Sequence, residues 1–130
     1  MNTTCGSPIE SLIKNYIEQK EKSFHYGKKR IDAEKEYNRL LTKYSGEAKN
    51  YSLDHADKIY TAYLEMTANT EEAKKAQTNF AEAEQKLNEI GEILFEATIN
   101  AEIAMTPVNG GLPAIRPVTV SYNNGQVIVS

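Results

Sequence analysis

The sequence predicts a mainly α-helical protein: a long, coiled-coil-like antiparallel helical hairpin that is followed by a C-terminal β-hairpin. Three observations predict it. Apolar residues recur at steps of three and four through most of residues 8–105. Gly and Pro are few, with seven and four residues, so long segments run without a helix breaker. The last residues alternate apolar and polar side chains around Asn124-Gly125, which is typical of a tight hairpin turn. We treat residues 1–130 as a single domain.

The first helix is expected over residues 8–45. Ser7 is a good N-cap, Pro8 suits the first helical position, and Glu10 completes a capping box. The apolar residues that follow recur at helical spacing; they are Ile9, Leu12, Ile13, Tyr16, Ile17, Phe24, Ile31, Tyr37, Leu40, Leu41 and Tyr44. Gly46 interrupts this pattern, so a loop is expected over residues 46–52.

The second helix is expected over residues 53–105, with Ser52 as its cap. It carries a regular seam of apolar and small residues, which are Ala56, Ile59, Tyr63, Met66, Thr70, Ala73, Ala76, Phe80, Ala83, Leu87, Ile90, Leu94, Ala97, Ala101 and Ala104. Two consecutive steps of three occur after Thr70, so a kink at 67–72, or a break near 67–70 that gives three helices, is an alternative. Because 67–72 contains neither Gly nor Pro, we favour a continuous helix.

The position of the loop predicts how the two helices face each other. An antiparallel hairpin around this loop pairs residues whose numbers add up to about 97. The expected pairs are Ile17 with Phe80, Phe24 with Ala73, Ile31 with Met66 and Leu41 with Ala56. Residues 90–105 then extend beyond the start of the first helix, and they are strongly apolar. Such a segment is usually buried, so another part of a protein has to cover it.

The predicted β-hairpin spans residues 118–130, after an extended linker at 106–117 that contains Pro113 and Pro117. A two-residue turn pairs Tyr122 with Val127 and Val120 with Val129, and Val118 lies on the same apolar face. We expect this face to cover residues 90–105. The sequence leaves two alternatives open: the hairpin covers its own helix or that of a neighbouring chain.

Charge and composition restrict the classes of protein. The net charge of −3 combines +3 over residues 1–52, −7 over residues 53–106 and +1 from Arg116, so the two helices are electrostatically complementary. Cys5 is the single cysteine, which rules out an intrachain disulfide. We see neither a secretory signal nor an apolar run long enough to span a membrane. We expect a protein of the cytoplasm or of a virion or similar particle.

A search for catalytic chemistry yields no candidate residues. His25 and His55 are far apart in the sequence, and no Glu-x-x-His, zinc-ligand or nucleophile motif occurs. The Gly110-Gly111 pair follows the second helix instead of opening one, so it does not suggest a phosphate site. We therefore expect no enzyme activity, no metal or other cofactor and no small-molecule substrate.

One basic stretch is a candidate anion-binding surface. Lys28, Lys29 and Arg30 lie within residues 20–30, where basic and aromatic side chains alternate as in some nucleic-acid-binding proteins. The protein as a whole is acidic, so we favour a solvated face that pairs with the acidic second helix. Nucleic-acid binding through 20–30 is kept as an alternative.

These patterns are typical of a non-enzymatic structural or assembly protein, a helical-hairpin subunit of a larger oligomer or particle such as a phage connector or a secretion apparatus. Its expected partners are proteins: further copies of itself, other subunits, or both. The candidate interface residues are apolar; they are Ile90, Ile93, Leu94, Phe95, Ile99, Ile103, Val118, Val120, Tyr122, Val127 and Val129. The alternative in the same class is a small cytosolic adaptor, chaperone or inhibitor that binds a partner protein.

Overall fold

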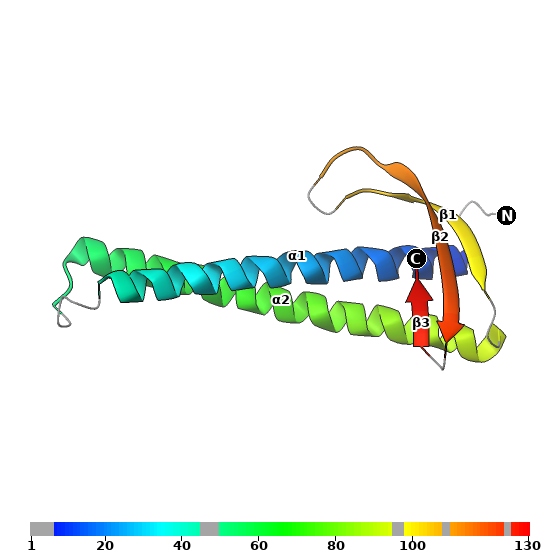
Figure 1. Ribbon diagram of the computed structural model, residues 1–130, viewed down its shortest axis with the longest axis horizontal. Coiled ribbons are helices and arrows are strands. Elements are labelled where there is room, and N and C mark those ends of the chain that lie inside the picture. The colour runs from blue at the N-terminus through cyan, green and yellow to red at the C-terminus, as the bar shows by residue number, and fades with distance from the viewer. Residues whose placement is uncertain (1–6, 45–49, 95–97, 108–109, 124–125) are drawn as a thin grey trace. The chain divides into compact units, whose positions relative to one another are not determined.

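The computed structural model describes residues 7–44, 50–94, 98–107, 110–123 and 126–130. Two long helices pack against each other, and three strands form an antiparallel sheet, which confirms the predicted fold class (Figure 1). The elements in chain order are α1 (Pro8–Lys43), α2 (Leu53–Leu94), β1 (Ile99–Met105), β2 (Ala114–Asn123) and β3 (Gln126–Val129).

The chain divides into two compact units, each of which contains a part of both helices. The first, here called the sheet unit, comprises Met1–Lys22 and Gln77–Ser130. The second, here called the helical unit, comprises Ser23–Ala76. Each unit has its own cluster of buried apolar side chains.

Both helices begin where their caps predict. The Ser7 Oγ accepts a hydrogen bond from the Glu10 backbone N–H at 3.3 Å, and the Ser52 Oγ accepts one from the His55 N–H at 3.1 Å. These bonds satisfy backbone donors that have no partner within the first turn of a helix. The first helix ends at Lys43, two residues before its predicted end. Most of the loop expected at 46–52 lies outside the described residues.

The second helix is continuous through residues 67–72, as favoured above. Three polar side chains in this region, Thr67, Asn69 and Thr70, each donate a hydrogen bond to the backbone carbonyl four residues earlier, at 2.9, 2.8 and 2.8 Å. Thr and Asn often end a helix, because their side chains can form hydrogen bonds with backbone groups in caps and turns. Here they bind carbonyls of the helix itself, so the helix does not end.

The predicted end of the second helix is wrong. The helix stops at Leu94 rather than at 105, and Ile99–Met105 forms the strand β1. The physical reason is an alternation that a strand places on one face. Ile99, Ala101, Ile103 and Met105 are buried or half-buried, whereas the intervening residues are exposed. The linker expected at 106–117 is also too long, because β2 begins at Ala114 and pairs with β1 from there.

The predicted β-hairpin register is confirmed. Tyr122 pairs with Val127 and Val120 pairs with Val129. Thr119 and Ser130 exchange two backbone hydrogen bonds of 2.9 Å each. The turn predicted at 124–125 lies outside the described residues.

A proline lies within the central strand without breaking a ladder bond. Pro117 is opposite Glu102 of β1. The backbone N–H and C=O groups of Thr119 bond to Ser130, on the β3 side of β2. Backbone groups alternate sides along a strand, so those of residue 117, two positions earlier, also point to the β3 side. No residue of β3 is paired with position 117. Pro117 has no N–H to donate, and at this position none is needed.

The sheet covers the helices of its own unit, which corresponds to the first of the two alternatives left open by the sequence. The fully buried side chains are Ile13 from α1, Leu87 from α2, Ile103 from β1 and Val120 from β2. They belong to one cluster with the other buried residues of the sheet unit, which are Tyr16, Ile17, Ala83, Ile90, Met105 and Val118. The hairpin therefore rests on its own chain.

One contact brings the sheet unusually close to α2. The Tyr122 ring lies directly on Gly91, where a Cβ atom would be only 2.6 Å from the ring atoms Cδ1 and Cε1. The Tyr122 hydroxyl donates a hydrogen bond to the Leu87 carbonyl. Burial raises the pKa of this hydroxyl, and the backbone amide of Gly91 acts in the opposite direction. Only glycine at position 91 allows the ring to approach the helix backbone in this way.

The register expected for the two helices is nearly right in the sheet unit. Tyr16, one residue before the expected Ile17, contacts Phe80, with ring centroids 5.2 Å apart. The slip is within the precision of a register that was taken from the loop position alone.

In the helical unit, two of the expected core residues point to solvent. Phe24 is 78% exposed and Ile31 is 44% exposed, so their predicted burial is wrong. The apolar cluster of this unit lies further along the helices and consists of Leu40, Tyr44 and Ala62 with Tyr37 and Ile59.

We expect Gly91→Ala to destabilise the protein. An alanine normally stabilises a helix interior by up to about 1 kcal/mol relative to glycine. Here the new methyl group overlaps the Tyr122 ring, and overpacking of this kind costs about 1–3 kcal/mol. The change is measured as the midpoint of urea unfolding, followed by near-UV absorption of tyrosine and by circular dichroism. Gly27→Ala is the matched control, because a Cβ at Gly27 meets no atom within 4 Å, and it should leave stability unchanged or increase it. Equal stabilisation by both substitutions would contradict the contact.

Truncation after Thr106 should cause aggregation. It removes β2 and β3, and thereby uncovers Ile13 and Leu87. Size-exclusion chromatography of the truncated and full chains at equal concentration measures the effect. A truncated chain that elutes as a folded monomer would show that the sheet does not cover the helices.

Candidate functional site

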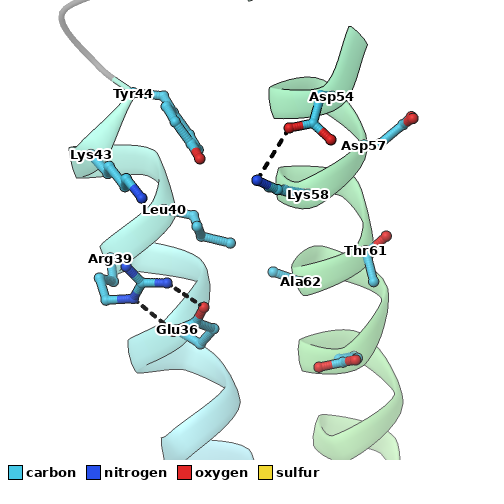
Figure 2. A pocket seen from close by; sticks show the side chains of 11 residues that line it. Glu36, Arg39, Leu40, Lys43, Tyr44, Asp54, Asp57, Lys58, Thr61 and Ala62 are labelled. Atoms are coloured by element: carbon cyan, nitrogen blue, oxygen red, sulfur yellow. Dashed lines mark hydrogen bonds and ion pairs between the residues drawn. The ribbon is translucent and has the colours of Figure 1, made fainter. Parts of the chain in front are cut away.

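The described residues contain an open groove in the helical unit, between the end of α1 and the beginning of α2 (Figure 2). Its volume is about 450 Å³. The apolar side chains of Leu40, Tyr44 and Ala62 line part of it and belong to the buried cluster of this unit. The other lining residues are charged except for Thr61; the charged ones are Glu36, Arg39, Lys43, Asp54, Asp57, Lys58 and Glu65.

Several of these charges neutralise each other along the same helix. Arg39 makes a bidentate pair with Glu36, with its Nε and Nη2 at 2.8 and 2.7 Å from the two carboxylate oxygens. On α2, the Lys58 ammonium lies 3.1 Å from an Asp54 carboxylate oxygen. Figure 2 shows both pairs as dashed lines. The pairs follow i,i+3 and i,i+4 spacing, which brings side chains together on one helix face.

The geometry of the groove favours packing over chemistry. The Tyr44 ring stacks on the His55 ring, with centroids 4.0 Å apart and an interplanar angle of 20°. The Lys43 ammonium lies 5.5 Å from the centre of the Tyr44 ring. These cationic and aromatic groups contact one another, and Arg39 and Lys58 are held by carboxylates. We therefore see a polar rim over an apolar cluster, without an arrangement of nucleophile and base among the lining residues.

The hydrogen bond from Arg39, and to a smaller extent the charges of Arg39 and Lys43, lower the pKa of the Glu36 carboxyl, while its partial desolvation acts in the opposite direction. On the other helix, the Asp54 carboxylate raises the pKa of the Lys58 ammonium through their hydrogen bond and its charge. Both shifts stabilise the charged forms, so the groove keeps its ion pairs at neutral pH.

The candidate anion-binding residues do not converge on one site. The Arg30 guanidinium pairs with Glu34 at 3.2 Å, and the Lys29 ammonium lies 5.9 Å from the centre of the Tyr26 ring. Lys28 is exposed. Successive helical positions point about 100° apart, so the three side chains leave the helix in three directions.

Most of the candidate interface residues are buried or half-buried within the sheet unit. Ile90, Ile103, Val118 and Val120 are buried there. The half-buried members pack against the same cluster; they are Ile99, Tyr122, Val127 and Val129. By contrast, Ile93 is 78% exposed and Leu94 is 41% exposed at the end of α2. Phe95 lies outside the described residues.

The described parts of the chain show no group of three or more His, Cys, Asp or Glu side chains that is placed to hold a metal ion. No helix in the part of the chain that the structure describes is long and apolar enough to cross a membrane. Comparisons with models of protein families, with characterised proteins and with solved structures found no match.

Sequence reasoning missed the groove and the contact between Tyr122 and Gly91. The groove had a signal, because Glu36 precedes Arg39 by three positions and Asp54 precedes Lys58 by four. Gly91 also had a signal, as a lone glycine inside a helical pattern, which often marks close packing. Its partner was not visible, because the contact depends on how the sheet folds back on the helix.

Arg39→Gln should raise the pKa of Glu36, because it removes the hydrogen bond that holds this carboxyl in its charged form. An NMR titration of the glutamate side-chain carbonyl signals measures the shift. Lys43→Gln is the matched control and should change the titration of Glu36 less, since Lys43 acts only through its charge. Unchanged titration of Glu36 in the Arg39→Gln variant would contradict the bidentate pair.

Proposed function

We propose that this protein is a non-enzymatic structural subunit that assembles with further copies of itself or with other subunits through the open edge of its sheet. The observation that carries the proposal is the strand order β1-β2-β3, in which β1 and β3 are both edges among the described residues. An edge strand presents unpaired N–H and C=O groups, which are a template for pairing with another chain.

The edge of β1 is the longer of the two, with seven residues against four in β3. Backbone bonds alternate along an antiparallel strand. In the pairing of β1 with β2, Ala101 lies opposite Val118, and the backbone N–H and C=O groups of Val118 point towards β1 and away from β3. The backbone groups of Asn100, Glu102 and Ala104 therefore point to the open side. A strand from another chain can form hydrogen bonds with these three residues without disturbing the sheet.

No other described strand pairs with the outer side of β1, whereas the apolar face of the sheet is covered by helices. Val118 and Val120 are buried against the helices of their own chain, so the hairpin does not offer them to a partner. This changes the expected mode of assembly from contact through a sheet face to addition of a strand. Two exposed apolar side chains, Leu112 just before β2 at 88% and Ile115 near the start of β2 at 70%, add surface that a partner can bury.

The proposed setting is an oligomer or particle, such as a virion, a phage connector or a secretion apparatus. The same edge also suits a small adaptor that binds one extended peptide of a partner protein. The two roles differ in self-association, which an assembly subunit has and a simple adaptor lacks.

Light-scattering mass at increasing concentration tests the proposal. We expect the mass to rise above the 14.6 kDa of one chain. Ala104→Pro removes one N–H from the open edge and leaves the bonds to β2 in place, so it should reduce association. Ala104→Thr is the matched control, because it keeps the N–H and suits a strand. A wild-type chain that stays monomeric would contradict the assembly role, and equal association of both variants would contradict the edge as the contact.

A further inference from the structure

Two exposed stripes run along the outer sides of the helical unit, one on each helix. The stripe on α1 consists of Phe24, Lys28, Ile31 and Lys35, all of them exposed. The stripe on α2 consists of Leu53, Asp57, Tyr60, Leu64 and Glu71, again all exposed. Within each stripe, neighbouring positions up to Lys35 and Leu64 are separated by steps of four, three and four. This is the spacing of a coiled-coil seam.

The apolar members of the stripes are large and well exposed. Phe24 is 78% exposed, Leu53 is 79% exposed and Tyr60 is 60% exposed. Ile31 and Leu64 are 44% and 48% exposed. Single exposed apolar residues are normal on a soluble protein, but a row of them at seam spacing is typical of a helix that packs against a partner.

Apart from Asp57, which lines the groove described above, both stripes lie away from the contact between the two helices. On α1 this contact uses Tyr37 and Leu40. At about 100° per residue, Ile31 lies about 120° around the helix from Tyr37, and Lys35 lies about 140° from Leu40. On α2 the contact uses Ala62, and Leu64 lies about 160° from it. The other helix of the same unit therefore does not cover either stripe.

The charges of the two stripes are opposite. The α1 stripe carries Lys28 and Lys35 and no acidic residue. The α2 stripe carries Asp57 and Glu71 and no basic residue. None of these four residues is a member of the ion pairs that the structure gives for the described residues. Each stripe is therefore complementary to the other and repels a copy of itself.

We propose that the α1 stripe of one copy packs against the α2 stripe of a second copy. Such a contact joins two different surfaces, so it is heterologous, and its repetition produces a ring or a filament instead of a closed dimer. The inference rests on the proposed role as an assembly subunit, but it uses the helical unit and not the sheet edge. The second copy is favoured over an unrelated partner because the two complementary surfaces are both present on this chain.

The contact is tested by mixing two variants, each of which lacks the apolar side chains of one stripe. Phe24→Gln with Ile31→Gln removes the apolar part of the α1 stripe, and Tyr60→Gln with Leu64→Gln removes that of the α2 stripe. Glutamine suits an exposed helix position, so the fold should be kept, which circular dichroism checks. Both variants carry Ala104→Pro, so that the sheet edge is weakened. Each variant alone should sediment as one chain, and an equimolar mixture should form a species of two chains and no larger.

The outcomes separate this contact from the sheet edge. A mixture that stays at the mass of one chain overturns the inference. Dimers of the variant with an intact α1 stripe, in the absence of the other variant, also overturn it, because they indicate a contact between identical stripes. If the wild-type chain associates while the Ala104→Pro chain with intact stripes is a monomer, the edge is the contact and the helix contact is excluded. A monomeric wild-type chain contradicts both proposals.

Charge reversal gives a second readout. Lys28→Glu with Lys35→Glu should abolish the contact, because the α1 stripe then carries charge of the same sign as the α2 stripe with its Asp57 and Glu71. Adding Asp57→Lys and Glu71→Lys to the same chain should restore it. High salt should weaken the contact of the wild-type stripes, because exposed charges are screened. Reversal of the two lysines without loss of association would overturn the proposed pairing of unlike stripes.

Discussion

The close approach of Tyr122 to Gly91 is the constraint on which the rest of the sheet unit depends. It joins the middle strand of the sheet to α2 by a ring contact and by a hydrogen bond to the Leu87 carbonyl. Side chains alternate between the two faces of β2, so Val118 and Val120 lie on the same face as Tyr122 and also contact the helices. β1 and β3 then pair with β2 on either side. An isolated two-stranded hairpin is marginal in water, and this packing supplies the support that it lacks.

Local signals predicted much of the fold, and the failures have a common cause. Caps at Ser7 and Ser52 and the hairpin register depend on neighbouring residues, and the structure confirms them. Residues 99–105 satisfy two patterns, because Ala101 and Ala104 continue the helical seam while Ile99, Ala101 and Ile103 alternate as in a strand. Pairing with β2 selects the strand. Such a choice is made by tertiary contacts, which local propensity does not contain.

The candidate sites show the same limit. The ion pairs of the groove follow from spacing along one helix, so the sequence contained them. Phe24 and Ile31 were expected in the core because they continue the spacing of Ile17, but the helical unit packs through Tyr37 and Leu40 instead. The seam spacing indicated a packing surface correctly and did not indicate which surface it meets. Solvent exposure of these two residues is what makes a contact with another copy a reasonable proposal.

The central claim, that the sheet rests on the helices of its own chain, is tested most directly by nuclear Overhauser effects between the Tyr122 ring protons and the Gly91 α-protons. The sample contains isotope-labelled and unlabelled copies of the full chain. The two are prepared separately, mixed, unfolded and then refolded together. We predict cross-peaks within one chain, with Gly91 α-protons shifted by the ring current of Tyr122, and no cross-peaks between labelled and unlabelled chains. Cross-peaks found only between different chains, or not at all, would contradict the account.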